Sequence, residues 1–81
     1  MNALTLEIRQ ARRLPPPPMA AAIRRAAGVS QARMAAALGV NRVTIARWEA
    51  TGASWSRRPR GELRQRYTEL LDELRREVLE S

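Results

Sequence analysis

The chain has 81 residues, the size of one small domain, and contains neither cysteine nor histidine. This composition excludes disulfide bonds, thiolate chemistry, cysteine-based zinc sites and the commonest general base, so we expect no enzyme activity, no metal and no cofactor. The formal net charge is +7, and all fifteen basic residues are arginines.

The charge is divided unevenly along the chain. Residues 1–61 hold eleven arginines against two acids, a balance of +9, whereas residues 62–81 hold four arginines against six acids, a balance of −2. A basic body predicts a polyanionic partner, and the acidic tail predicts a different role for the last segment. No apolar run approaches the roughly 20 residues that cross a bilayer, and the N-terminus lacks the charge order of a secretory signal. We therefore expect a cytoplasmic, nucleoid-associated protein without membrane contact.

Residues 1–17 are predicted to form an N-terminal arm or short helix that ends in a proline spacer. Leu4 and Ile8 lie at helical spacing, but Leu4, Leu6 and Ile8 also alternate as in a strand. We favour a helix over residues 2–14 because good helix formers surround these positions. The prolines at 15–18 then prevent this helix from continuing.

The next helix is predicted over residues 18–27, with Gly28 as its left-handed cap. Arg24 and Arg25 are expected on its outer face. Its inner face is expected to carry three apolar residues, Ala22, Ile23 and Ala26.

Two further helices are predicted over residues 31–38 and 42–50, with Ser30 and Asn41 as their N-caps. The break between them falls at Gly39, which can adopt the positive φ that a sharp turn needs. Two short helices joined by a three- to four-residue turn that contains glycine form a helix-turn-helix. The second helix is expected to protrude from the domain, because a helix fits a major groove about 12 Å wide.

The rest of the chain predicts a basic loop over residues 51–60 and a long helix over residues 61–81. Trp55 is expected to anchor the loop from beneath, with base stacking as the alternative. The long helix carries an apolar stripe formed by Leu63, Tyr67, Leu70, Leu71, Leu74 and Val78. We expect its first half to close the core and its second half to pair with a second copy of the chain. The residues assigned to dimerisation are Leu70, Leu71, Leu74 and Val78.

The stretch SQARMAAALGVNRVTIARWE, residues 30–49, resembles the helix-turn-helix of the Cro/phage-repressor (XRE-type) family. The matching positions are Gln31, Met34, Ala35, Leu38, Gly39, Val40, Asn41, Ile45, Trp48 and Glu49. The resemblance covers residues 19–49 and implies DNA binding. After this segment the chain departs from the family, because many relatives have two further short helices there. The fold class is thus expected to be all-α, with about four helices: a helix-turn-helix core over residues 18–60 and a long C-terminal helix.

Ile45 and Trp48 are expected to face inward from the second helix of the motif, which leaves Arg42, Val43 and Arg47 facing outward. The resemblance implies that these three residues approach base edges and that Gln31 contacts the sugar-phosphate backbone. Further backbone contacts are expected from Ser30, Arg33, Asn41, Thr44, Arg57, Arg58 and Arg60. For Ser30 and Asn41 the alternative is plain helix capping. For the three arginines of the loop the alternative is simple exposure to solvent.

The leading hypothesis is a sequence-specific double-stranded DNA-binding protein, a small repressor-like transcription regulator of phage or prophage type. As a homodimer it would engage two half-sites about 34 Å apart. One alternative is an antitoxin-like module that keeps a DNA-binding helix-turn-helix and also binds a protein partner through residues 1–14 or 61–81. Another is a non-specific architectural DNA binder. Single-stranded RNA is a less suitable ligand, because the three aromatic residues form no stacking platform.

Overall fold

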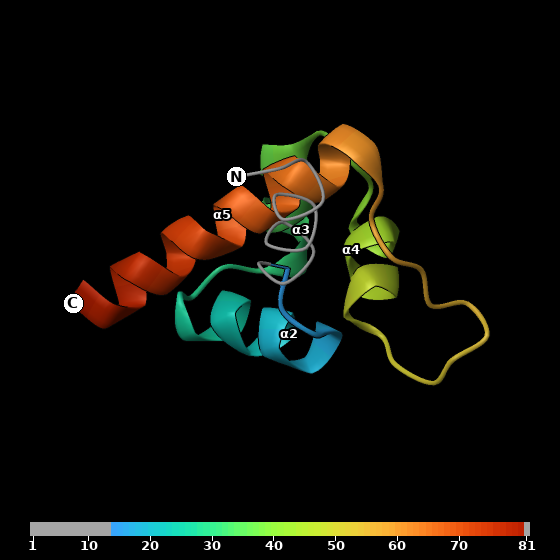
Figure 1. The fold of residues 1–81 in the computed structure, drawn as a ribbon, viewed down its shortest axis with the longest axis horizontal. Helices are drawn as coiled ribbons and strands as arrows, with labels where there is room; N and C mark the ends of the chain where they lie inside the picture. The colour runs from blue at the N-terminus through green and yellow to red at the C-terminus, as the bar shows by residue number, and fades with distance from the viewer. Residues whose placement is uncertain (1–13, 81) are drawn as a thin grey trace, which may run out of the picture.

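The computed structural model describes residues 14–80, which form four α-helices and no strand (Figure 1). The helices are α2 (Pro17–Ala26), α3 (Gln31–Leu38), α4 (Arg42–Glu49) and α5 (Gly61–Glu80). The predicted all-α fold with a long C-terminal helix is therefore confirmed. The helix predicted over residues 2–14 lies, except for its last residue, outside the described range. Among the described helices, none has both the length and the apolar content that a membrane crossing requires.

The helices begin where the local chemistry predicts. α2 starts at Pro17, one residue earlier than expected, because prolines in the first turn lack only N–H groups that would have no partner in the helix. The Ser30 hydroxyl accepts a hydrogen bond from the Arg33 N–H at 3.1 Å, and the Asn41 side-chain oxygen accepts one from the Val43 N–H at 2.9 Å. Both predicted N-caps are thus confirmed.

The turn between α3 and α4 depends on Gly39, whose φ is +69°. This conformation lets the Val40 N–H donate to the Ala35 carbonyl at 3.0 Å, which closes the last turn of α3. A Cβ added to Gly39 would meet no atom within 4 Å. The position therefore favours glycine because of its backbone conformation and not because of crowding.

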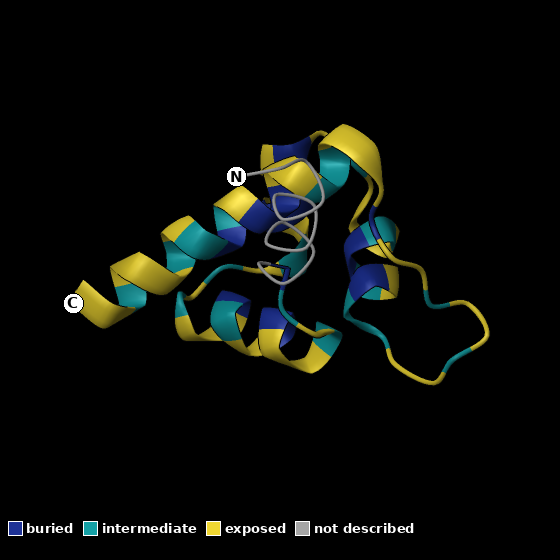
Figure 2. Cartoon of the chain, viewed as in Figure 1, coloured by how far each residue is buried: buried dark blue, intermediate teal, exposed yellow. Residues whose placement is uncertain are grey.

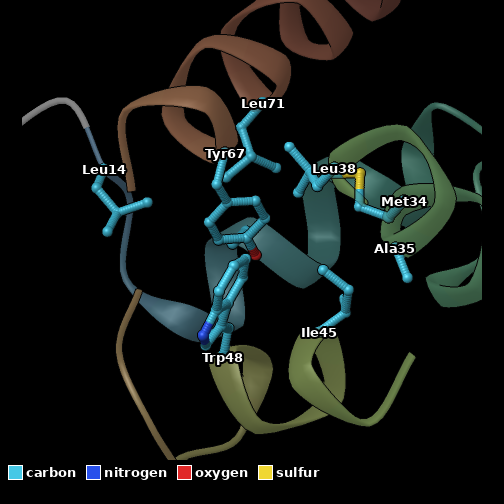
Figure 3. Close-up of a cluster of buried hydrophobic side chains, with 9 residues drawn as sticks. Leu14, Met34, Ala35, Leu38, Ile45, Trp48, Tyr67 and Leu71 are labelled. Atoms are coloured by element: carbon cyan, nitrogen blue, oxygen red, sulfur yellow. The ribbon is translucent and has the colours of Figure 1, made fainter. Parts of the chain in front are cut away.

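The hydrophobic core lies where the four helices meet Leu14, which precedes α2 by three residues (Figure 3). Its buried members are Leu14, Ala20, Met34, Ala35, Leu38, Ile45, Trp48, Tyr67 and Leu71. The rings of Trp48 and Tyr67 pack with their centroids 4.8 Å apart at an angle of 44°, which joins α4 to α5. The middle of α5 therefore contributes to the core through Tyr67 and Leu71.

The second half of α5 extends past the helix-turn-helix body (Figure 1), and most of its surface is exposed (Figure 2). The four residues predicted for dimerisation divide into two groups. Leu71 is buried in the core of its own chain, where a second copy cannot reach it. Leu70, Leu74 and Val78 are half-buried, and the first two pack against the edge of the core while part of their surface stays exposed.

The rotation of α2 about its axis differs from the prediction. Its buried residues are Ala20, Ala21 and Arg24. The residues predicted to face the core are instead exposed or half-buried: Ala22, Ile23 and Ala26. The prediction that Arg24 lies outside is wrong, because a carboxylate at the end of α4 binds its guanidinium inside the fold. Alanines on both sides of α2 left its apolar pattern without a clear inner face.

Candidate nucleic-acid interface

The outer face of α4 carries the three residues predicted to read bases. Arg42, Val43 and Arg47 are exposed, whereas Ile45 and Trp48 on the opposite side are buried. Figure 1 shows α4 at the edge of the fold, next to the loop that follows it. A guanidinium can bond guanine O6 and N7 with two parallel hydrogen bonds, and a valine methyl can contact the methyl group of thymine.

Polar side chains at the N-termini of α3 and α4 lie close to this face in sequence and fold. Ser30 and Asn41 use their oxygens to cap the helices, while the hydroxyl and amide hydrogens can still be donated to a phosphate. Arg33 is exposed in the first turn of α3, and Thr44 is half-buried in the first turn of α4. The partial positive charge of each helix N-terminus adds to their attraction for phosphate.

Glu49, the last residue of α4, holds together three segments of the fold. Arg24 donates to it from Nε at 2.6 Å and from Nη2 at 3.0 Å, and Gln31 donates from Nε2 at 3.1 Å. Arg24 also donates a hydrogen bond from Nη1 to the Val29 carbonyl, at 2.9 Å. In this ion pair the side chain of Arg24 is only 10% exposed and that of Glu49 only 6%. The hydrogen bond to Glu49 raises the pKa of Arg24 above its ordinary value, so the guanidinium stays charged.

The sequence interpretation missed this ion pair, because it placed Arg24 outside and gave Glu49 no structural role. A signal was available. Glu49 is the sole acid between Glu7 and Glu62, in a region rich in arginine. A lone carboxylate one residue from a core tryptophan favours a buried cationic partner, because charged side chains are almost never fully buried unless they are paired.

Gln31 connects the buried ion pair to the outer face of α4. Its Nε2 donates to Glu49, and its Oε1 accepts a hydrogen bond from Arg42 Nη1 at 3.2 Å. A continuous series of side-chain hydrogen bonds therefore runs from Arg24 through Glu49 and Gln31 to Arg42. Its last bond gives the exposed guanidinium of Arg42 a partner on α3.

Residues 50–60 form a loop that projects beside α4 (Figure 1). The Arg57 N–H donates to the Arg47 carbonyl at 3.1 Å, which ties the loop to the last turn of α4. The Arg57 side chain turns back onto the loop, where Nη1 donates to the carbonyls of Ser54 and Ser56 at 3.0 and 2.7 Å. The loop thus has a defined shape next to the outer face of α4.

Two other arginines of the loop, Arg58 and Arg60, are exposed. The prediction that Trp55 anchors the loop from beneath is wrong, because its side chain is 49% exposed. Pro59 is the buried residue of the loop.

Tyr67 lies behind the ion pair, in the core between α4 and α5. Its hydroxyl is buried and has no hydrogen-bond partner among the described residues. Burial, and secondarily the negative charge of Glu49, raises the pKa of Tyr67 to about 12. The phenol is therefore neutral at physiological pH and serves the packing of the core.

Residues 21–53 match the family model described as Helix-turn-helix. This segment begins within α2 and ends just after α4, so it contains both the buried ion pair and the outer face of α4. Residues 21–53 are thus similar to the XRE-type helix-turn-helix family, in agreement with the resemblance seen in the sequence. This similarity supports a DNA-binding helix-turn-helix in this part of the chain. Helix α5 lies outside the matched segment, and no characterised protein or solved structure matches the chain.

Proposed function

We propose that this XRE-type helix-turn-helix protein is a sequence-specific regulator that binds double-stranded DNA and lowers transcription by occupying a promoter. Helix α4 enters the major groove with its outer face. Arg42 and Arg47 each bond a guanine, and Val43 contacts a thymine methyl group. The observation that supports this most directly is the division of α4 into an exposed basic face and a buried apolar face.

The distribution of charge supports the same proposal. Residues 14–61 contain eight arginines and a single acid, Glu49, which is already paired with Arg24. Phosphate contacts come from the N-termini of α3 and α4, with Gln31, Ser30, Asn41, Thr44 and Arg33, and from the arginines of the loop. Contacts at both ends of α4 would fix its angle in the groove.

The protein binds DNA as a homodimer in this proposal. A dimer reads two half-sites that are related by the same two-fold axis, one helical turn of about 34 Å or a multiple of it apart. The partly exposed Leu70, Leu74 and Val78 on α5 supply apolar surface for such a contact. Two weak readers joined in this way give one specific complex.

The test is in-vitro selection of randomised duplex DNA with the full chain, followed by titration of the selected sequence. We expect an inverted repeat. Arg42→Ala and Arg47→Ala should each weaken binding by about 1–3 kcal/mol and relax preference at one base pair in each half-site. Arg76→Ala is the matched control, because Arg76 is exposed on α5 away from α4.

The alternatives give different results in the same assay. A non-specific architectural protein would bind every duplex with a steep salt dependence and would enrich no sequence. A module whose main ligand is another protein would bind duplex DNA weakly at every salt concentration. Either result would remove the reading role assigned here to Arg42, Val43 and Arg47.

A further inference from the structure

An open apolar groove of about 220 Å³ lies between α2 and the last turns of α5. Six of its seven lining residues are apolar, namely Met19, Ala22, Ile23, Ala26, Val78 and Leu79. The seventh is Arg75, at the rim. Met19 and Leu79 are 48% and 76% exposed, and they are two of the four large apolar side chains exposed within residues 14–80. Exposed apolar side chains are therefore concentrated in this groove.

We propose that this groove is the contact surface for a second copy of the chain, with Leu79 of each copy inserted into the groove of the other. The inference rests on the proposed function, because the homodimer is part of that proposal. It adds the location of the dimer interface. It also extends the dimer surface from α5 to the face of α2 that was expected to lie in the core.

The shape of the groove favours a second copy over other occupants. A symmetric dimer contact uses the same patch on both chains, so the patch must contain both a projection and a hollow that fits it. Here Leu79 projects into solvent, and the hollow beside it is lined by Ile23 and Ala26. Two chains related by a two-fold axis can therefore bury both copies of Leu79 at once.

The charges around the groove are also self-complementary. The last turns of α5 carry Glu73, Glu77 and Glu80 together with two arginines, whereas α2 carries arginines and no acid. Arg25 is exposed on α2, and Arg75 lines the groove. The glutamates of one α5 can therefore pair with these arginines when the helix lies across the groove of the other chain. Such pairs at the rim set the orientation of a complex more than its affinity.

The position of the groove leaves the DNA-reading face free. Figure 1 shows the end of α5 and the end of α2 on one side of the molecule, and α4 with its loop on the other side. An apolar surface has little to offer a phosphate backbone, so DNA is an unsuitable occupant. A dimer formed here places the two α4 helices at its far ends, so we expect the two half-sites to lie farther apart than one helical turn.

Sedimentation equilibrium of the full chain without DNA tests the proposal. We expect a monomer–dimer equilibrium whose dissociation constant rises about tenfold or more in Met19→Glu and in Leu79→Glu. Both positions are exposed, and a glutamate in the first turn of α2 is favourable for the helix, so both variants should fold. Trp55→Glu is the matched control: it removes an equally exposed apolar side chain outside the groove and should leave the equilibrium unchanged.

Three results would overturn the proposal. The chain could remain monomeric at its highest soluble concentration, or it could dimerise equally well in both groove variants. As a third result, the chain could be a monomer that loses the same stability in the groove variants, in a deletion of residues 1–13, and in the two changes combined. Residues 1–13 of the same chain would then be the occupant of the groove. Titration of a DNA duplex that contains a single half-site distinguishes this test from that of the proposed function, because one chain can bind a half-site without a dimer. The groove variants should keep half-site affinity, and loss of half-site binding in the unaltered chain would count against the function alone.

Discussion

Replacing Arg24 by alanine is expected to remove a large part of the stability of the fold. The guanidinium donates to Glu49 at 2.6 and 3.0 Å and to the Val29 carbonyl at 2.9 Å, and the ion pair is almost completely buried. In the variant, the Glu49 carboxylate stays inside the fold with the Gln31 amide as its remaining donor. Removal of one partner from a buried ion pair costs about 3–5 kcal/mol. A chain of this length has about 4–12 kcal/mol in total.

Thermal and urea unfolding, followed by far-UV circular dichroism, measure this effect. For a domain of this size each kcal/mol corresponds to about 4–8 °C, so the midpoint should fall by about 12–40 °C. Arg33→Ala is the control, because Arg33 is an exposed arginine on the neighbouring helix α3. Its replacement should change the free energy of unfolding by less than about 0.5 kcal/mol.

A double variant distinguishes the loss of the pair from the cost of an unpaired charge. Arg24→Met combined with Glu49→Leu removes both charges and keeps most of the buried volume, so it should recover much of the stability lost in Arg24→Ala. A loss below about 1 kcal/mol in Arg24→Ala, or a double variant less stable than the single one, would refute the view that an unpaired buried carboxylate dominates the cost.

Three further predictions follow from the turn, the core and the hydrogen-bond series. Gly39→Ala should lower the free energy of unfolding by about 1–2 kcal/mol, because φ is positive there, and Gly39→Asn should cost less; urea titration of both variants tests this. Tyr67→Phe should be neutral or stabilising at pH 7, because the hydroxyl has no partner among the described residues. The folded-state pKa is raised from 10.0 to about 12, so the contribution of Tyr67 is complete below pH 10 and is lost as the pH rises towards 12; denaturation across this range should show the loss in the unaltered chain and not in Tyr67→Phe. Gln31→Ala should weaken binding to the selected operator by about 0.5–1.5 kcal/mol, measured by duplex titration, because Arg42 loses its hydrogen-bond acceptor.

The parts of the fold that could be predicted from sequence depend on local chemistry. Ser30 and Asn41 mark the starts of α3 and α4, and Gly39 marks the turn, because each acts on backbone groups within a few residues of itself. The exposure of the outer face of α4 also followed from the spacing of Ile45 and Trp48. The DNA contacts assigned to that face remain a prediction.

The features that sequence reasoning missed depend on partners far along the chain. Arg24 is buried because of a carboxylate 25 residues later, and no local pattern in α2 announces it. Alanines on several sides of α2 made its rotation ambiguous, so an exposed face was assigned to the core. The exposure of Trp55 and the hydrogen bonds of the Arg57 side chain to carbonyls of its own loop depend on the path of the loop, which composition alone does not determine.

The hydrogen bond between Gln31 and Arg42 has a consequence for how the specificity of such a protein can change over time. Val43 and Arg47 lie on the outer face without a part in the core, so under the proposed function a new residue at either position would give a folded protein with an altered DNA preference. Position 42 is different, because a residue there that cannot donate leaves the Gln31 side-chain oxygen without its partner on α4. Under the same proposal, substitutions at positions 43 and 47 would change operator preference alone, whereas a substitution at position 42 would also change the surroundings of a residue on α3.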